Sequence, residues 1–92
     1  MKEKIKTYLV NKYNEKGKKM VGLEYISYIL ANYKMDNKAK VINICEKLSE
    51  VYDRSKNSIS SAMNLYVSNV TYMSVKEFLI DTYEEIKREK II

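Results

Sequence analysis

The chain contains no proline and only two glycines, Gly17 and Gly22, among its 92 residues. An all-β fold needs a turn residue about every 8–12 positions, so a sequence with so few turn formers is hard to fold into sheets. The proportions of apolar residues, 46%, and of charged residues, 32%, are those of an ordered globular protein. The sequence therefore predicts an all-α fold, a compact bundle of about five helices that spans residues 1–92 as a single domain.

The periodicity of the apolar residues divides the chain into five expected helices. Their ranges are residues 2–15, 23–33, 39–52, 56–72 and a last helix that follows Ser74. Three of these helices have, at or near their start, side chains that can accept a hydrogen bond from the free N–H groups of a first turn, namely Asp36 or Asn37, Ser55 or its competitor Asn57, and Ser74. Each helix carries one apolar stripe, which in the third helix includes either Val51 or Tyr52. These stripes predict one shared hydrophobic core.

The third and fourth expected helices are separated by a short polar turn, which is the outline of a helix-turn-helix. An ordinary corner between two helices of a bundle has the same spacing, so both interpretations remain open on spacing alone. The fourth helix differs from a typical DNA-reading helix because its outward residues carry no charge. These outward residues are Ser58, Ser60, Ser61, Asn64, Leu65 and Ser68.

Three stretches of the sequence share a pattern with one known family. They are residues 22–26 (GLEYI), residues 48–63 (LSEVYDRSKNSISSAM) and residues 74–79 (SVKEFL). Through these stretches the chain resembles the C-terminal DNA-binding effector domain of the sporulation master response regulator of spore-forming bacteria. The resemblance implies a helix-turn-helix domain whose fourth helix enters the major groove of DNA. It does not extend to the arginine-rich outer face of that family's recognition helix, because serines and Asn64 stand there instead.

An uncharged recognition helix is suited to A·T base pairs. Asn64 can bond the edge of adenine, and Leu65 can contact a thymine methyl group. Ser58 and Ser61 can each bond either kind of base. We therefore take these four residues as base-reading candidates, and we expect a transcriptional regulator that binds double-stranded DNA.

Positive charge is concentrated in the first 20 residues, which hold seven lysines against two glutamates. This excess equals the formal net charge of the whole chain, +5. A basic segment can bind the phosphate backbone regardless of base sequence, although a solvated lysine-rich surface is the ordinary alternative. Positive residues at the start of the fourth helix oppose its dipole unless an anion is bound there. The phosphate-binding candidates are therefore Lys18, Lys19, Arg54, Ser55 and Lys56.

A protein-binding module is the second interpretation of the uncharged helix. A neutral face with small side chains costs little to desolvate, so residues 58–68 could dock a protein instead of DNA. A small phage-encoded inhibitor of a host protein or of a nucleic-acid-binding complex would be of this kind, and a homodimer is also allowed. Lysines from residues 2–19 beside Arg54 and Lys56 would favour DNA, whereas an acidic last helix beside residues 58–68 would favour a protein.

Catalytic and metal-binding patterns are missing from the sequence. It contains no histidine, and its only cysteine, Cys45, falls on an apolar stripe with no base to activate it. No carboxylate pair, glycine-rich phosphate loop or cluster of metal ligands is present. We therefore expect a protein that is not an enzyme and that holds no metal or cofactor. The lone cysteine and the lack of a signal peptide or of an apolar run of about 18 residues predict a cytoplasmic protein with no membrane partner.

Overall fold

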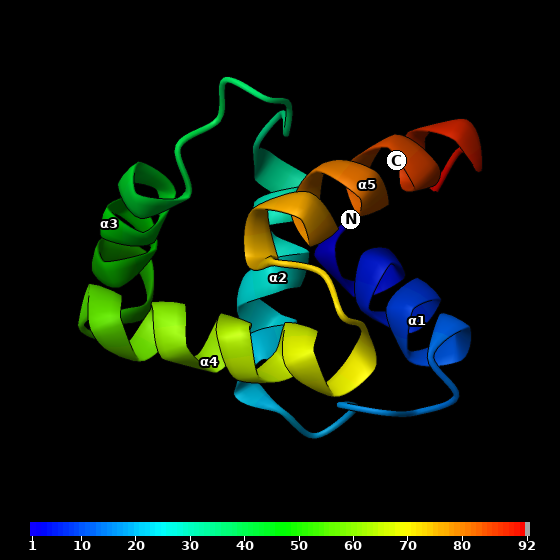
Figure 1. Ribbon diagram of the computed structural model, residues 1–92, viewed down its shortest axis with the longest axis horizontal. Helices are drawn as coiled ribbons and strands as arrows, with labels where there is room; N and C mark the ends of the chain where they lie inside the picture. Colours follow the sequence, from blue (N-terminus) through cyan, green and yellow to red (C-terminus); the bar gives the residue numbers. More distant parts are fainter. Residues whose placement is uncertain (92) are drawn as a thin grey trace.

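The computed structural model describes residues 1–91 and consists of five α-helices (Figure 1). The helices are α1 (Lys2–Lys12), α2 (Val21–Asn32), α3 (Val41–Tyr52), α4 (Lys56–Val70) and α5 (Val75–Arg88). No strand occurs within the described residues. The predicted all-α class and the predicted number of helices are therefore confirmed. None of these helices is both long and apolar enough to cross a lipid bilayer.

The first two helices differ from their expected bounds, and the backbone after α1 explains where that helix ends. Asn14, Glu15 and Gly17 have positive φ angles of 52°, 67° and 72°, which lie in the left-handed region and cannot continue an α-helix. α1 therefore ends at Lys12, three residues earlier than expected. α2 begins at Val21, two residues earlier than expected.

Two of the three predicted N-caps are confirmed. The Oγ of Ser55 accepts the N–H of Ser58 at 3.1 Å, and the Oγ of Ser74 accepts the N–H of Glu77 at 3.2 Å. The cap at Asp36 or Asn37 was wrong, because α3 begins only after Lys40 and has no side-chain cap. Asp36 Oδ1 instead accepts the N–H of Lys38 at 2.9 Å, which closes a local turn before the helix begins.

α2 runs through the middle of the molecule, and α4 crosses α2 near the N-terminus of α2 (Figure 1). α3 lies on the opposite side from α1 and α5. Side chains from all five helices meet in one core, whose fully buried members include Leu9, Ile26, Leu48, Met63 and Phe78. The predicted stripes are thus buried together. Of the two residues that could complete the apolar stripe of the third helix, Tyr52 does so. Val51 is 52% exposed, while the ring of Tyr52 packs edge-on against Tyr25 and Tyr28.

Both glycines lie against one side chain of α4. A Cβ on Gly22 would stand 2.3 Å from the carbonyl oxygen of Ala62 and 2.7 Å from the Cβ of Tyr66. A Cβ on Gly17 would stand 2.6 Å from the Cε1 of Tyr66, at a residue whose φ already favours glycine. The close crossing of α2 and α4 therefore requires Gly22, and the bend before it requires Gly17.

Candidate nucleic-acid interface

A three-residue connection, Asp53 to Ser55, fixes how α4 follows α3. Asp53 adopts a left-handed conformation, with φ 52° and ψ 49°, and its N–H donates to the carbonyl oxygen of Ser49. The N–H of Arg54 donates to the same oxygen at 3.2 Å. Aspartate tolerates this conformation better than most residues do, so the chain can turn sharply without a glycine. The hydroxyl of Ser55 is taken up by its capping role and is therefore engaged before any ligand binds.

The outer face of α4 consists of uncharged, exposed residues. They are Ser58, Ser61, Asn64, Leu65 and Ser68. Leu65 is 63% exposed, so it presents an apolar surface to solvent. Asn64 donates one amide N–H to the carbonyl oxygen of Ser60 at 3.0 Å, which leaves its side-chain oxygen and second N–H for another partner. All four base-reading candidates therefore share one accessible face, whereas Ser60, also expected to face outward, is half-buried.

A hollow borders the outer face on one flank, between the starts of α3 and α5. Ser60 and Asn64 of α4 line this Asn64 hollow, together with Lys40 before α3 and Lys76 in the first turn of α5. Its lining includes no carboxylate. Lys76 donates to the carbonyl oxygen of Asn37 at 3.0 Å, and Lys40 forms no ion pair within the described chain.

The opposite flank of α4 lies beside the connection between α1 and α2. The side chains of Asn69 and Met20 meet there, with Nδ2 and Sδ 3.4 Å apart. Lys18 and Lys19 immediately precede Met20; Lys18 pairs with Glu15 at 3.0 Å, whereas Lys19 has no ion pair among residues 1–91. These two phosphate candidates therefore lie toward the C-terminal half of the helix.

The first turn of α4 carries the other phosphate candidates. Lys56 Nζ lies 3.4 Å from Glu46 Oε1, and both side chains are about half exposed. Arg54 is exposed and has no ion pair in the described chain. Since α4 has 15 residues and a helix rises about 1.5 Å per residue, roughly 20 Å separates these cations from those near Met20. The phosphate candidates form two groups, one near each end of the helix, so Lys18 and Lys19 do not lie beside Arg54 and Lys56 as the DNA interpretation expected.

Sequence reasoning missed Lys40 and Lys76. Both stand where a helix begins, Lys40 as the N-cap of α3 and Lys76 in the first turn of α5. A positive charge there opposes the helix dipole, which is the same signal that singled out Arg54 and Lys56. The signal was present in the sequence for both lysines, because the expected bounds also place Lys40 and Lys76 in the first turn of a helix.

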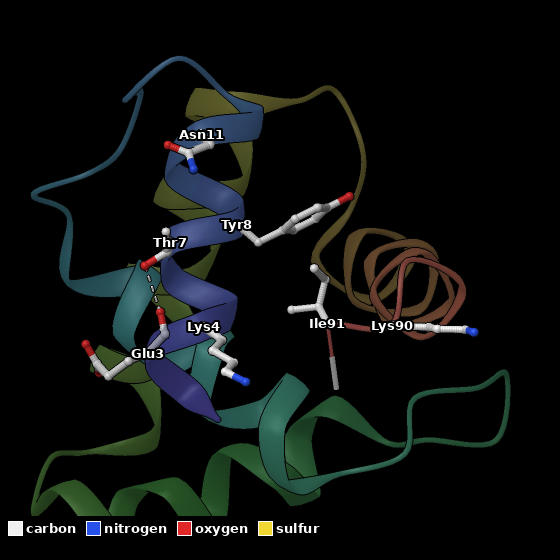
Figure 2. A pocket seen from close by; sticks show the side chains of 7 residues that line it. All are labelled: Glu3, Lys4, Thr7, Tyr8, Asn11, Lys90 and Ile91. Carbon is white, nitrogen blue, oxygen red and sulfur yellow. Dashed lines mark hydrogen bonds between the residues drawn. The ribbon is translucent and has the colours of Figure 1, made fainter.

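A further hollow lies between α1 and the C-terminal residues, and no residue of α4 lines it. Its lining includes Thr7 and Asn11 of α1 and Ile91 near the end of the chain (Figure 2). Lys4 and Lys90 are also among its lining residues. None of the predicted site residues lines this hollow.

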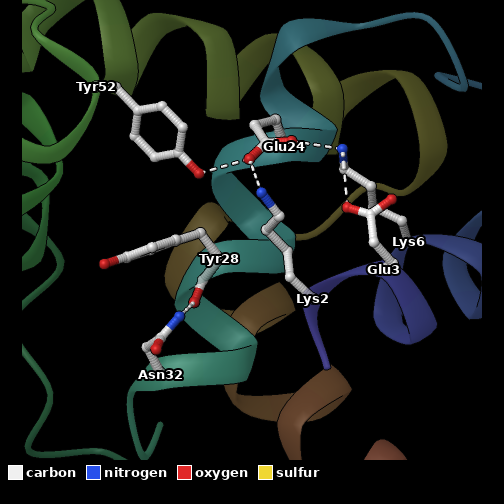
Figure 3. Close-up of polar contacts among 7 residues, drawn as sticks. All are labelled: Lys2, Glu3, Lys6, Glu24, Tyr28, Asn32 and Tyr52. Atoms are coloured by element: carbon white, nitrogen blue, oxygen red, sulfur yellow. Dashed lines mark hydrogen bonds and ion pairs between the residues drawn. The ribbon is translucent and has the colours of Figure 1, made fainter.

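Lysines of α1 are largely engaged in ion pairs with other helices. Lys2 and Lys6 both contact the carboxylate of Glu24 on α2, and the hydroxyl of Tyr52 on α3 donates to it at 2.5 Å (Figure 3). Burial alone would raise the pKa of Glu24, but these hydrogen bonds outweigh it and lower the pKa to about 2. One carboxylate thus links three helices.

Glu85 on α5 holds the other end of α1. Its carboxylate accepts hydrogen bonds from Lys12, at 2.6 and 2.8 Å, and from the hydroxyl of Tyr8. Burial opposes ionisation, yet these bonds keep the pKa of Glu85 below its ordinary value. Of the four lysines of α1, only Lys4 has no ion pair within the described residues. The basic region available near the N-terminus is therefore the connection after α1 more than the helix itself.

Groups that could bind metal or act as a nucleophile are scarce. No cluster of three or more potential ligands among histidine, cysteine, aspartate and glutamate occurs within residues 1–91. The thiol of Cys45 is buried, and burial raises its pKa, which disfavours the reactive thiolate.

No protein-family model, curated protein or solved structure matches the chain. The resemblance to the effector domain of the sporulation regulator therefore stays a prediction that rests on residues 22–26, 48–63 and 74–79.

Proposed function

We propose that the protein is a transcriptional regulator that binds double-stranded DNA through a helix-turn-helix, with α3 as its first helix and α4 as its recognition helix. The observation that carries this proposal is the position of the cations around α4. Lys40 and Lys76 lie on one flank and Lys18 and Lys19 on the other, while the face between them is uncharged. A helix in the major groove has a phosphate backbone on each side and base edges in front, which matches this distribution.

No acidic residue of α5 lines the Asn64 hollow beside the outer face. Glu77, Asp81 and Glu84 line a separate hollow together with Met73 and Ile80. The residue of α5 that does line the Asn64 hollow next to α4 is basic, Lys76. An acidic last helix beside the outer face would have favoured a protein partner. The basic residue there supports a polyanion as the ligand of the surface around α4.

Readout by this face would be weak and would favour A·T pairs. The free groups of Asn64 can bond adenine, and exposed Leu65 can contact a thymine methyl group. No arginine is placed on the outer face to make the bidentate contact to guanine that contributes about 1–3 kcal/mol. Affinity should come mainly from phosphate contacts and should fall steeply as salt is added.

Fluorescence anisotropy with A·T-rich and random duplexes tests the proposal. The decisive variant is Ser61→Glu, which places a negative charge at the centre of the outer face. The matched control is Asn11→Glu, which adds the same charge to an exposed residue of α1. We expect Ser61→Glu to weaken binding about tenfold or more at ~50 mM salt, where charge effects are strong, and the control to change it less than about twofold.

A third variant, Asn64→Ala, tests base readout and should reduce the preference for A·T-rich duplexes. Wild-type protein that binds neither duplex at ~50 mM salt would overturn the proposal, because phosphate contacts are strong there. The outer face would then have to be a docking surface for a protein.

A further inference from the structure

The connection between α2 and α3 forms an open hollow with the first two turns of α3. Four lysines line this lysine hollow: Lys34, Lys38, Lys40 and Lys47. No carboxylate is among its lining residues. None of the four lysines forms an ion pair within residues 1–91. Of the four, only Lys40 also lines the Asn64 hollow beside α4, and none was singled out by the sequence.

The nearest carboxylates along the chain form no ion pair with these four lysines among residues 1–91. Asp36 is half-buried and accepts the backbone N–H of Lys38. Glu46, on α3, is paired with Lys56. The four lysines are exposed, so their mutual repulsion is weak, and an anion bound among them would remove it. The uncapped start of α3, which has no acidic residue in its first turn, adds to the same preference for negative charge.

The lysine hollow is continuous with the surface proposed to bind DNA. Lys40 lines both the lysine hollow and the Asn64 hollow, so the two meet beside the flank of α4. We propose that the lysine hollow is a phosphate-binding site, which in the complex takes phosphates of the DNA strand that borders this flank of α4. This inference rests on the proposed function. It adds the path of the DNA phosphate backbone, which runs from Lys40 toward Lys38 and Lys47.

A paired substitution tests this inference with a matched control. The test variant carries Lys38→Gln and Lys47→Gln, which leave Lys40 and the Asn64 hollow intact. The control carries Lys4→Gln and Lys90→Gln, which remove two lysines from the hollow beside α1 (Figure 2). Both variants lose the same charge, and none of the four lysines has an ion pair in the described chain.

Duplex affinity is measured by anisotropy at several salt concentrations. We expect the slope of log K against log salt to become shallower by about 2 in the test variant and to stay unchanged in the control. The loss of affinity should be equal for A·T-rich and random duplexes, because phosphates carry no sequence information. Equal slopes in the test variant and the control would overturn the inference.

A titration with inorganic pyrophosphate, followed by backbone amide NMR shifts, separates this inference from the proposed function. The shifts should move within residues 34–47 in the wild type and in Ser61→Glu, and should not move in the test variant. Absent shifts, or shifts spread over the whole surface, would overturn the phosphate site. If pyrophosphate binds there but no duplex binds, the phosphate site stands while its DNA-backbone role and the proposed function fail together.

Discussion

Two groups of lysines lie on different sides of the molecule and have opposite surroundings. In α1, three of the four lysines contact a carboxylate of another helix, either Glu24 or Glu85. The four lysines of the lysine hollow contact no carboxylate among residues 1–91. On the first side positive charge holds helices together, and on the second it is left available to an anion. Local pairing, and not the density of lysine in the sequence, therefore indicates where a polyanion would bind.

The side of the molecule around α1, where Lys2, Lys6 and Lys12 are paired, is called the paired side here. It is stabilised by carboxylates that several donors share. Glu24 joins α2 to α1 and α3, and Glu85 joins α5 to α1. Charge-assisted hydrogen bonds at partly buried positions are stronger than exposed ion pairs, so these contacts contribute to the fold. The four lysines of the lysine hollow form no comparable ion pair among residues 1–91.

The largest loss of stability should come from a substitution where α2 crosses α4, because both groups of lysines are held in place by helices that pack against this crossing. Gly22→Ala places a Cβ 2.3 Å from a backbone oxygen that cannot move without shifting α4. We expect the free energy of unfolding to fall by about 3 kcal/mol, even though alanine favours a helix by up to ~1 kcal/mol. Urea denaturation measures the change. Ser61→Ala, on the outer face, is the control and should stay within about 0.5 kcal/mol.

A somewhat smaller loss should follow Glu24→Gln, which affects only the paired side. The variant leaves Lys2, Lys6 and Tyr52 without their shared carboxylate. We expect a loss of about 2 kcal/mol, since hydrogen bonds to charged groups contribute about 1.5–3 kcal/mol. Glu3→Gln is the matched control, because Glu3 is 76% exposed and lies 3.7 Å from Lys6. Equal effects of the two variants on urea denaturation would mean that the Glu24 cluster does not hold α1.

Acid should weaken the paired side selectively. The pKa of Glu24 is about 2 in the folded protein against an ordinary 4.5, so the unfolded chain takes up the proton first as the pH falls. The stability that Glu24 contributes is complete above pH 4.5 and is lost progressively toward pH 2. The pKa of Glu85 is also lowered, which adds a loss of the same sign. Urea denaturation between these pH values should show a shallower decline in Glu24→Gln than in the wild type.

Local patterns were sufficient to predict the helices, and distant contacts explain what was missed. The stripes and the caps at Ser55 and Ser74 depend on neighbours within one or two turns, which the sequence displays directly. The pairing of α1 depends on partners 22 residues away for Lys2 and 73 residues away for Lys12, which no local pattern reveals. Charge counting could therefore not distinguish the paired lysines of α1 from Lys18 and Lys19 in the connection that follows it.

The candidate site was predictable in part for the same reason. Exposure of Ser58, Ser61, Asn64 and Leu65 follows from the helical period, and their common face is confirmed. The lysine hollow was not predictable, because it forms only when the connection between α2 and α3 folds back beside α3. Met35, which is 2% exposed, anchors this connection in the core although it lies outside any helix. No periodicity indicates such an anchor.

The smallest change in stability, and one of opposite sign, should come from Lys38→Gln with Lys47→Gln. Removing two of four like charges relieves repulsion, so the free energy of unfolding should rise, by less than about 0.5 kcal/mol. Lys2→Gln with Lys6→Gln removes the same charge from the paired side and should lower it, because Glu24 loses both lysines.

Urea denaturation at ~20 mM and ~500 mM salt distinguishes the two pairs, because exposed charges are screened more than partly buried ones. The gain in the first pair should vanish at high salt, and part of the loss in the second should persist. If both pairs lower stability alike, the lysine hollow is held together by its lysines and is not left open for an anion. Opposite signs for the same change of charge would mean that the fold uses one group of lysines and tolerates the other.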